Sequence, residues 1–133
     1  MDQIDLWLKR AKSNLYAAKA INEYDFFEAG GHVFFEEPCF ELQQCAEKAL
    51  KALLLHRNID FPKTHDLSKL IKLIKDNGIF VPESILDATK LIKYAITTRY
   101  PESFDPVTKE EYEEAVKIAE NVYEWAEKLI NEA

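Results

Sequence analysis

The sequence has no apolar run long enough to cross a membrane. A membrane-spanning helix needs roughly eighteen or more consecutive apolar residues, and no stretch of the 133-residue chain approaches that length. The N-terminal segment MDQIDLWLKR carries acidic residues where a secretory signal needs a basic flank and an apolar core. We therefore expect a cytoplasmic protein without a membrane segment.

Motifs typical of phosphate loops, metal sites and disulfides are also scarce. The chain has no glycine-rich phosphate loop and no internal repeat. Its two cysteines, Cys39 and Cys45, are six residues apart, which would place them on different faces of a helix. His32, His56 and His65 lack the i, i+4 spacing of a helical metal site. We expect reduced cysteines, no metal site and no cofactor.

Positive charge is in the minority, with 17 basic against 24 acidic residues and a net charge of −7. This balance argues against broad nucleic-acid binding, which depends on lysine and arginine meeting phosphates. The charge is unevenly spread, however. Residues 38–99 hold ten basic and seven acidic side chains, a net +3, while the segments before and after carry −3 and −7. The middle of the chain is either a local anion site or a set of solvated helix faces.

Apolar residues recur at spacings of three and four in five segments, and no segment alternates convincingly with period two. The length suits one domain with one core. The pattern therefore predicts an all-α fold, an up-and-down helical bundle of four to five helices in a single domain over residues 1–133.

Local signals predict the limits of the first three helices. The first follows Asp2 as N-cap, and the second has Pro38 in its first turn and continues to residue 57. The second helix has the widest apolar stripe, so we expect it to be the most buried. The third spans 67–76, with Thr64 or Asp66 as its cap and Asn77-Gly78 at its end.

The last two helices have equally clear starting points. Pro82 opens the fourth, which should continue to Arg99 or Tyr100 because Pro101 prevents further helix. The fifth begins at Thr108-Lys-Glu-Glu111, where the hydroxyl and the carboxylate can each cap the other residue's backbone N–H.

The segment 22–37 has no assignable secondary structure, because Gly30-Gly31 interrupts any helix there. Six aromatic residues lie between Tyr24 and Phe40. This excess exceeds what a surface connection needs and predicts a homodimer interface.

A polar stripe runs along the second helix beside its apolar stripe. Gln44, Glu47, Lys48 and Lys51 stand at i, i+3, i+4 and i+7, so they share one face. The stripe is either an ordinary solvated face or a set of groups that pair with groups on another helix.

The tripeptide Arg99-Tyr100-Pro101 ends the predicted fourth helix. An arginine beside a turn made rigid by proline holds its planar guanidinium N–H donors in place, which suits it to bind a phosphate or a carboxylate. Alternatively, the guanidinium caps the last carbonyls of its own helix.

Three segments together resemble the HEPN family (higher eukaryotes and prokaryotes nucleotide-binding). They are the run 40–55 (FELQQCAEKALKALLL), the motif 64–67 (THDL), and Tyr94 followed by Arg99-Tyr-Pro101. With the flanking helices the likeness covers nearly the whole chain. It implies a bundle of four or five helices that commonly dimerises and is often paired with a minimal nucleotidyltransferase. In some such pairs, which act as toxin and antitoxin, the HEPN member is a metal-independent endoribonuclease.

The nuclease members of the family carry an arginine, four to six residues and then a histidine. Arg99 would be this arginine, but the window after it holds Phe104, Asp105 and Pro106 and no histidine. The departure argues against an efficient enzyme, because the histidine is expected to handle the proton or the scissile phosphate.

These observations lead to three hypotheses. The first is a HEPN-like module that binds a nucleotide, an RNA phosphate or a minimal nucleotidyltransferase partner. The second is a metal-independent endoribonuclease, the toxin of a toxin-antitoxin pair, with Arg99 and His65 as candidate catalytic residues. The third is a pure dimerisation domain. The predicted nucleotide- or anion-binding residues are Arg99, Tyr100, Lys48, Lys51, Gln44 and Glu47.

Overall fold

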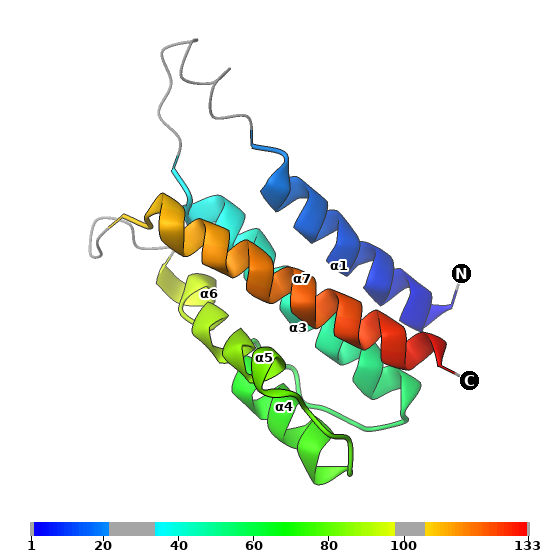
Figure 1. The fold of residues 1–133 in the computed structure, drawn as a ribbon. Helices are drawn as coiled ribbons and strands as arrows, with labels where there is room; N and C mark the ends of the chain where they lie inside the picture. The colour runs from blue at the N-terminus through cyan, green and yellow to red at the C-terminus, as the bar shows by residue number, and fades with distance from the viewer. Residues whose placement is uncertain (1, 22–33, 98–105, 133) are drawn as a thin grey trace.

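Helices make up all the regular structure in the residues that the computed structural model describes, 2–21, 34–97 and 106–132 (Figure 1). This confirms the predicted all-α fold. The elements are α1 (Gln3–Lys19), α3 (Glu36–His56), α4 (Leu67–Asp76), α5 (Glu83–Leu86), the 3₁₀ helix η1 (Asp87–Leu91), α6 (Tyr94–Thr97) and α7 (Lys109–Asn131). No helix in these ranges is both long and apolar enough to cross a membrane.

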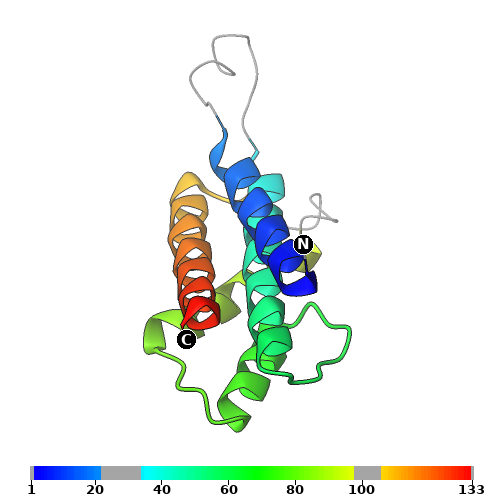
Figure 2. The same cartoon turned by 90° about the vertical axis from the view of Figure 1, so that its right-hand side faces the viewer.

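The long helices α1, α3 and α7 pack side by side, and α5, η1 and α6 form the return path between α4 and α7 (Figures 1 and 2). α7 runs in the same direction as α3. The Val107 backbone N–H donates to a Glu36 carboxylate oxygen (3.2 Å) where both helices begin, and the Arg57 guanidinium donates to the Leu129 carbonyl (3.4 Å) where both end. α1 runs the opposite way, as expected of an up-and-down bundle.

α3 lies at the centre of the core and confirms the expectation that it is the most buried of the described helices. It touches α1, α7, α4, η1 and α6. Leu42, Leu50, Leu53 and Leu54 are fully buried along it. Because α3 has neighbours on almost every side, polar side chains on it must also find partners inside the bundle.

The predicted helix caps are confirmed at both ends of the chain. The Asp2 carboxylate accepts from the Asp5 N–H at 2.8 Å. Thr108 and Glu111 form the reciprocal capping box of α7, with the Glu111 N–H donating to the Thr108 hydroxyl at 3.1 Å and the Thr108 N–H donating to the Glu111 carboxylate at 3.2 Å. The bond from the Thr108 backbone is the main reason why the pKa of Glu111 is lowered.

The ends of α4 are also as predicted. Of the two candidate caps, Asp66 is the N-cap, and its carboxylate accepts from the Ser68 N–H at 3.0 Å. At the other end Gly78 takes a left-handed conformation with φ of 84°, which glycine adopts without strain. The chain therefore turns sharply after Asn77.

The prediction of one continuous fourth helix is wrong. The segment begins with α5, which η1 follows directly. A turn at 92–93 then separates η1 from the short α6. Four residues at a strict spacing of three, Ile85, Ala88, Leu91 and Tyr94, are buried, and this spacing fits the three-residue period of a 3₁₀ helix. The Thr89 hydroxyl also donates to the Leu86 carbonyl (3.1 Å) and competes with the helical ladder.

Two other sequence-based predictions fall on residues outside the described ranges. The predicted end of the fourth helix at Arg99 or Tyr100 is one, and the aromatic segment from Tyr24 to residue 33 is the other. Of the aromatic residues that follow, Phe35 is buried with its ring centroid 4.9 Å from that of Tyr112 on α7.

Candidate functional site

A buried carboxylate lies at the middle of α3. Glu47 is only 4% exposed, and its two oxygens contact three side chains. Gln43 Nε2 donates to Oε1 at 3.0 Å, and Lys51 Nζ donates to Oε2 at 3.1 Å, each from one helical turn away. His65 Nδ1 lies 2.8 Å from Oε1. We call Gln43, Glu47, Lys51 and His65 the Glu47 cluster; it compensates a charge that would otherwise be costly to bury.

Lys51 connects the Glu47 cluster to two other segments. Its ammonium lies 5.7 Å from the ring centroid of Trp7 on α1 and 5.9 Å from that of Phe61 in the connection between α3 and α4. A cation this close to two aromatic faces gains attraction from both rings. Lys51 is therefore a buried structural cation, with Glu47 as its counter-ion and the rings of Trp7 and Phe61 close to its ammonium.

His65 is the exposed member of the Glu47 cluster. Its side chain is 68% exposed, although Nδ1 is bonded to the buried Glu47 carboxylate. Its backbone carbonyl accepts from Gln43 Nε2 at 3.3 Å, so both side chain and backbone are held against α3. Since the carboxylate only accepts, Nδ1 is the donor, and the second ring nitrogen, Nε2, remains for another partner. The arrangement presents an oriented imidazole to solvent.

A second polar contact joins α1 to α3 at Asn14, two helical turns after Trp7 along α1. Lys48 Nζ donates to Asn14 Oδ1 at 2.8 Å, and the Asn14 amide donates to a Glu41 carboxylate oxygen. Gln44 Nε2 donates to Gln43 Oε1 at 2.7 Å, so Gln44 is a neighbour of the Glu47 cluster. The polar stripe of α3 pairs with other segments and is not simply a solvated face.

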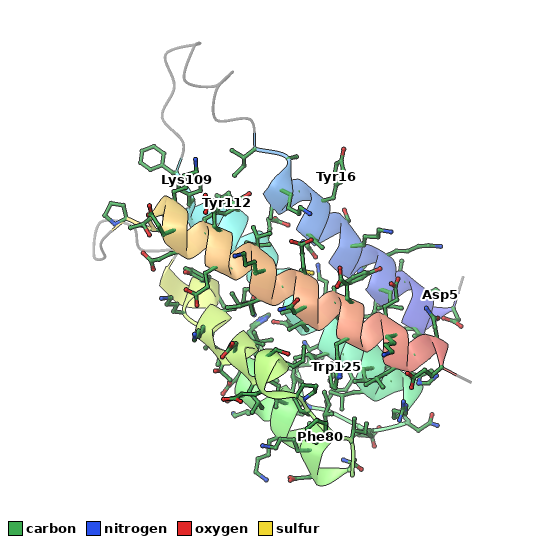
Figure 3. The ribbon with its side chains drawn as sticks, in the orientation of Figure 1. Asp5, Tyr16, Phe80, Lys109, Tyr112 and Trp125 are labelled. Carbon is green, nitrogen blue, oxygen red and sulfur yellow. The ribbon has the colours of Figure 1, made fainter. Side chains whose placement is uncertain are left out.

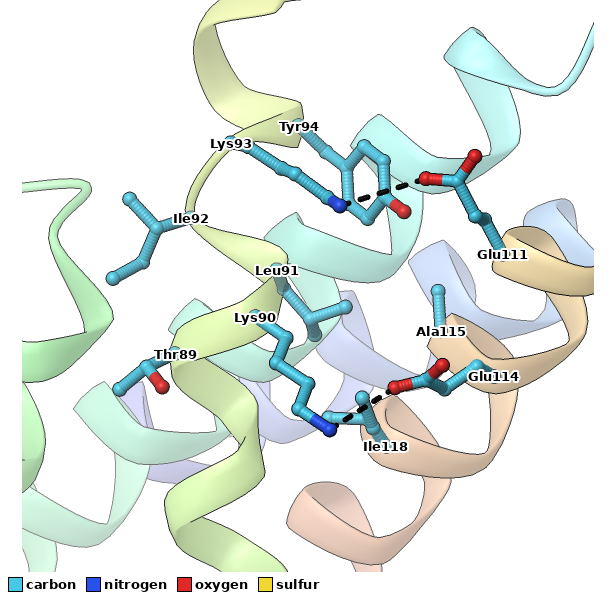
Figure 4. Close-up of a pocket in the computed structure, with 10 residues that line it drawn as sticks. All are labelled: Thr89, Lys90, Leu91, Ile92, Lys93, Tyr94, Glu111, Glu114, Ala115 and Ile118. Carbon is cyan, nitrogen blue, oxygen red and sulfur yellow. Dashed lines mark hydrogen bonds and ion pairs between the residues drawn. The ribbon is translucent and has the colours of Figure 1, made fainter. Parts of the chain in front are cut away.

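A cavity of about 520 Å³ lies elsewhere, between η1–α6 and α7 (Figure 4). Leu91, Tyr94, Ala115 and Ile118 are among its apolar lining residues. Two ion pairs cross it, Lys90–Glu114 at 3.3 Å and Lys93–Glu111 at 3.5 Å. None of the binding or catalytic residues predicted from the sequence that the structure describes lines this cavity.

The two cysteines offer no reactive thiolate. Both are free and buried, and burial raises the pKa of the Cys39 and Cys45 thiols to about 12. Near neutral pH each stays a neutral thiol, which is a poor nucleophile. Across the described part of the chain, no three histidine, cysteine, aspartate or glutamate side chains gather in a way that could hold a metal ion.

Comparison with known proteins now identifies the family. The model of the HEPN domain matches residues 4–129, nearly the whole chain. The chain belongs to the HEPN family.

The chain is also similar to three individual proteins. A protein of Methanocaldococcus jannaschii named "Putative toxin MJ1304" is 28% identical over 145 aligned positions, which cover 96% of this chain and 88% of the relative. The crystal structure of ST0689, described as an archaeal HEPN homologue, superposes with a TM-score of 0.70 at 28% identity, covering 98% of this chain and 100% of the other. TT1696 from Thermus thermophilus gives 0.72 at 32% identity, covering 96% and 98%.

The HEPN fold brings together most of the residues that the sequence singled out. Gln44, Glu47, Lys48 and Lys51 lie along one side of α3, and His65 reaches Glu47 from the connection that precedes α4. Lys51 is 7% exposed, whereas Lys48 is half-buried. Arg99 and Tyr100 lie outside the described residues, and the assignment of all these residues to an anion site stays a prediction.

Sequence reasoning missed three contributors to this region. Gln43 looked like an ordinary helix residue, although its position four residues before Glu47 was a signal for a hydrogen bond. Trp7 and Asn14 gave no such signal, because only the packing of α1 on α3 brings them to Lys51 and Lys48.

Proposed function

We propose that this HEPN protein binds RNA or a nucleotide through phosphate groups, at the surface formed by Lys48 and by His65, the exposed member of the Glu47 cluster. The observation that carries the proposal is the exposed imidazole of His65, held through Nδ1 by the buried Glu47. Buried residues that fix an exposed polar side chain are typical of a binding or catalytic site, because they hold the side chain ready for its ligand.

The chemistry of the surrounding groups favours an anionic ligand. Lys48 is a half-buried lysine, and Nε2 of His65, with Nδ1 already donating to Glu47, can donate to a phosphate oxygen in the imidazolium form. The site lies in the part of the chain with net charge +3, whereas the whole chain carries −7. This division favours a small local phosphate site over the broad positive surface of a general nucleic-acid binder.

The test is titration of the protein with single-stranded RNA and with a nucleoside triphosphate, by calorimetry. His65→Ala and Lys48→Ala should each weaken binding, by about tenfold or more for a lost charge-assisted hydrogen bond. Lys117→Ala is a matched control, because it removes an exposed positive charge from α7. Equal affinities for wild type, His65→Ala and Lys48→Ala would contradict the proposal.

A second candidate function is a metal-independent endoribonuclease of toxin type. Two observations favour it. The relative from M. jannaschii carries the name "Putative toxin MJ1304", and the Glu47–His65 pair has the arrangement of carboxylate and imidazole that orients a proton-transferring histidine. The window after Arg99 has no histidine, so His65 would have to move the proton.

Cleavage of single-stranded RNA in the presence of chelator separates the two functions. We expect no efficient cleavage by the wild type, because Arg99 lacks the histidine that completes the family's nuclease motif. Robust cleavage that His65→Ala removes would instead establish the nuclease and overturn the binding-only proposal.

The partners expected from the sequence are also part of the proposal. A homodimer and a separate minimal nucleotidyltransferase are the partners that the aromatic segment and the family resemblance favour. Light scattering tests the first: a mass near that of one 15.4 kDa chain at high protein concentration would contradict the homodimer. Copurification with a co-expressed nucleotidyltransferase tests the second.

A further inference from the structure

Two contacts fix how α1 lies against the polar side of α3. Near one end of α1 the Trp7 ring packs 5.7 Å from the Lys51 ammonium, and two helical turns later Asn14 bridges Lys48 and Glu41. Residues seven apart in a helix lie on the same side. One edge of α1 therefore follows the polar stripe of α3.

Arg10 stands on this edge of α1. It is three residues after Trp7 and four before Asn14, the two spacings that keep helical residues on one side. Arg10 is exposed, so its guanidinium is open to solvent beside the α1–α3 junction. Sequence reasoning did not single it out, because its position beside Lys48 depends on the packing of two helices.

The other basic residues of α1, Lys9, Lys12 and Lys19, lie elsewhere. Lys9 is exposed but only two residues after Trp7, which places it on the opposite side of the helix. Lys19 faces α7, where its ammonium pairs with Glu120 at 3.1 Å. Lys12 shares that side by helical spacing, and Tyr16, one turn further, is 77% exposed and points away from the bundle (Figure 3). Only Arg10 combines exposure with a position beside the polar stripe of α3.

The charges at this junction favour an external anion. The ammonium of Lys51 is buried and neutralised by Glu47, so it adds little positive potential to the surface. Lys48 and Arg10 remain as the outer cations. His65 approaches α3 from the connection that precedes α4, and Glu41 is the acidic group on the Asn14 side. The connection that carries His65 loops out beside α3 near the N-terminal half of α1 (Figure 2).

We infer that Arg10 is a phosphate contact for single-stranded RNA that lies across the junction of α1 and α3. The inference rests on the proposed function and extends the proposed surface onto a second helix. The planar guanidinium can bind two oxygens of one phosphate, which a lysine ammonium does less specifically. A strand on this path would meet Arg10, Lys48 and His65 and leave the acidic surface of α7 uncovered.

The experiment measures the affinity for a single-stranded RNA oligonucleotide as a function of salt concentration. Arg10→Ala should weaken binding about tenfold at low salt and lower the slope of log K against log [salt] by about 0.7, the value for one lost contact to a single strand. Arg10→Lys should keep most of the slope and lose part of the affinity. Lys12→Ala is the matched control, since it removes one positive charge from another side of the same helix and should leave the slope unchanged.

The outcomes separate this inference from the proposed function. A wild type that binds no RNA would overturn both. The assignment of Arg10 alone would be overturned if Lys48→Ala and His65→Ala weaken RNA binding while Arg10→Ala changes it no more than the control Lys12→Ala does. Arg10 is exposed, so circular dichroism and thermal unfolding of Arg10→Ala should match the wild type.

Discussion

Glutamate–lysine pairs occur both on α3, at its junction with α1, and between η1 and α7, but only the pair on α3 is kept away from water. The side chains of Glu47 and Lys51 are 5% and 9% exposed, whereas Glu114 and Lys90 beside the cavity are each 58% exposed. The distances between charged groups are similar, 3.1 and 3.3 Å. The two pairs therefore differ in the exposure of their side chains and not in the distance between their charged groups.

This difference predicts different roles for the two regions. A buried pair depends on both partners, because water cannot replace the one that is lost. An exposed pair is weak, because water and salt ions replace the missing partner at little cost. The Glu47 cluster therefore acts as a fixed support for His65, and the pairs across the cavity leave that side of the bundle free to adjust.

The largest effect is expected when the buried pair is broken. Lys51→Met should destabilise the protein by about 3–5 kcal/mol, since it leaves the Glu47 carboxylate buried without its cation. Denaturant unfolding measures the loss. Lys90→Met is the matched control and should cost less than about 1 kcal/mol. Losses of equal size would abolish the distinction between the two regions.

A double variant shows whether charge or packing causes this loss. Glu47→Leu combined with Lys51→Met removes both charges and should recover part of the stability lost in Lys51→Met alone. If the double variant loses more unfolding free energy than the two single variants lose together, packing and not the unpaired charge dominates.

Apolar burial on the same helix gives a reference for these values. Leu50 is fully buried in the core. Leu50→Ala should cost about 2–5 kcal/mol through lost burial and the cavity that remains. Unlike the loss in an exposed charged pair, this loss should not change with salt. A loss well under 1 kcal/mol in denaturant unfolding would show that this face of α3 is not packed as described.

The cap of α4 should give a smaller, pH-dependent effect next to the Glu47 cluster. Asp66→Ala should cost about 0.5–2 kcal/mol at neutral pH. Hydrogen bonds from Ser68 lower the pKa of Asp66 in the folded state. The cap therefore stabilises the fold above the pKa of the unfolded chain and loses this effect as the pH falls through the lower folded pKa. The stability difference between wild type and Asp66→Ala should shrink in acid; a difference that grows would contradict the cap.

Much of the fold was predictable because its signals are local. The caps at Asp2, Asp66 and Thr108 and the stop at Gly78 depend on residues within a few positions of each other. The break of the fourth helix was missed for a related reason. Ile85 and the buried residues after it, at a spacing of three, fit a 3₁₀ segment and one side of a short helix almost equally well, and packing decides between them.

The candidate site was only half predictable. Spacing alone put Glu47 and Lys51 on one face of a helix. That the same carboxylate also holds His65, 18 residues away, depends on the path of the connection between α3 and α4, which no local pattern determines. Arg10 shows the same limit more strongly, since only the packing of α1 on α3, through Trp7 and Asn14, turns its side of α1 toward the polar stripe.

The smallest effect is expected at the exposed pair, and it gives the most direct test of the comparison. Lys90→Ala breaks the contact with Glu114, but both groups are already more than half exposed. The expected cost is about 0–1 kcal/mol at low salt, and it should vanish at high salt because counter-ions screen the attraction. The loss in Lys51→Met should persist at the same salt concentration, because the Glu47 carboxylate is out of reach of those ions. A cost for Lys90→Ala that survives high salt would show that this side of the bundle is more tightly organised than its exposure indicates.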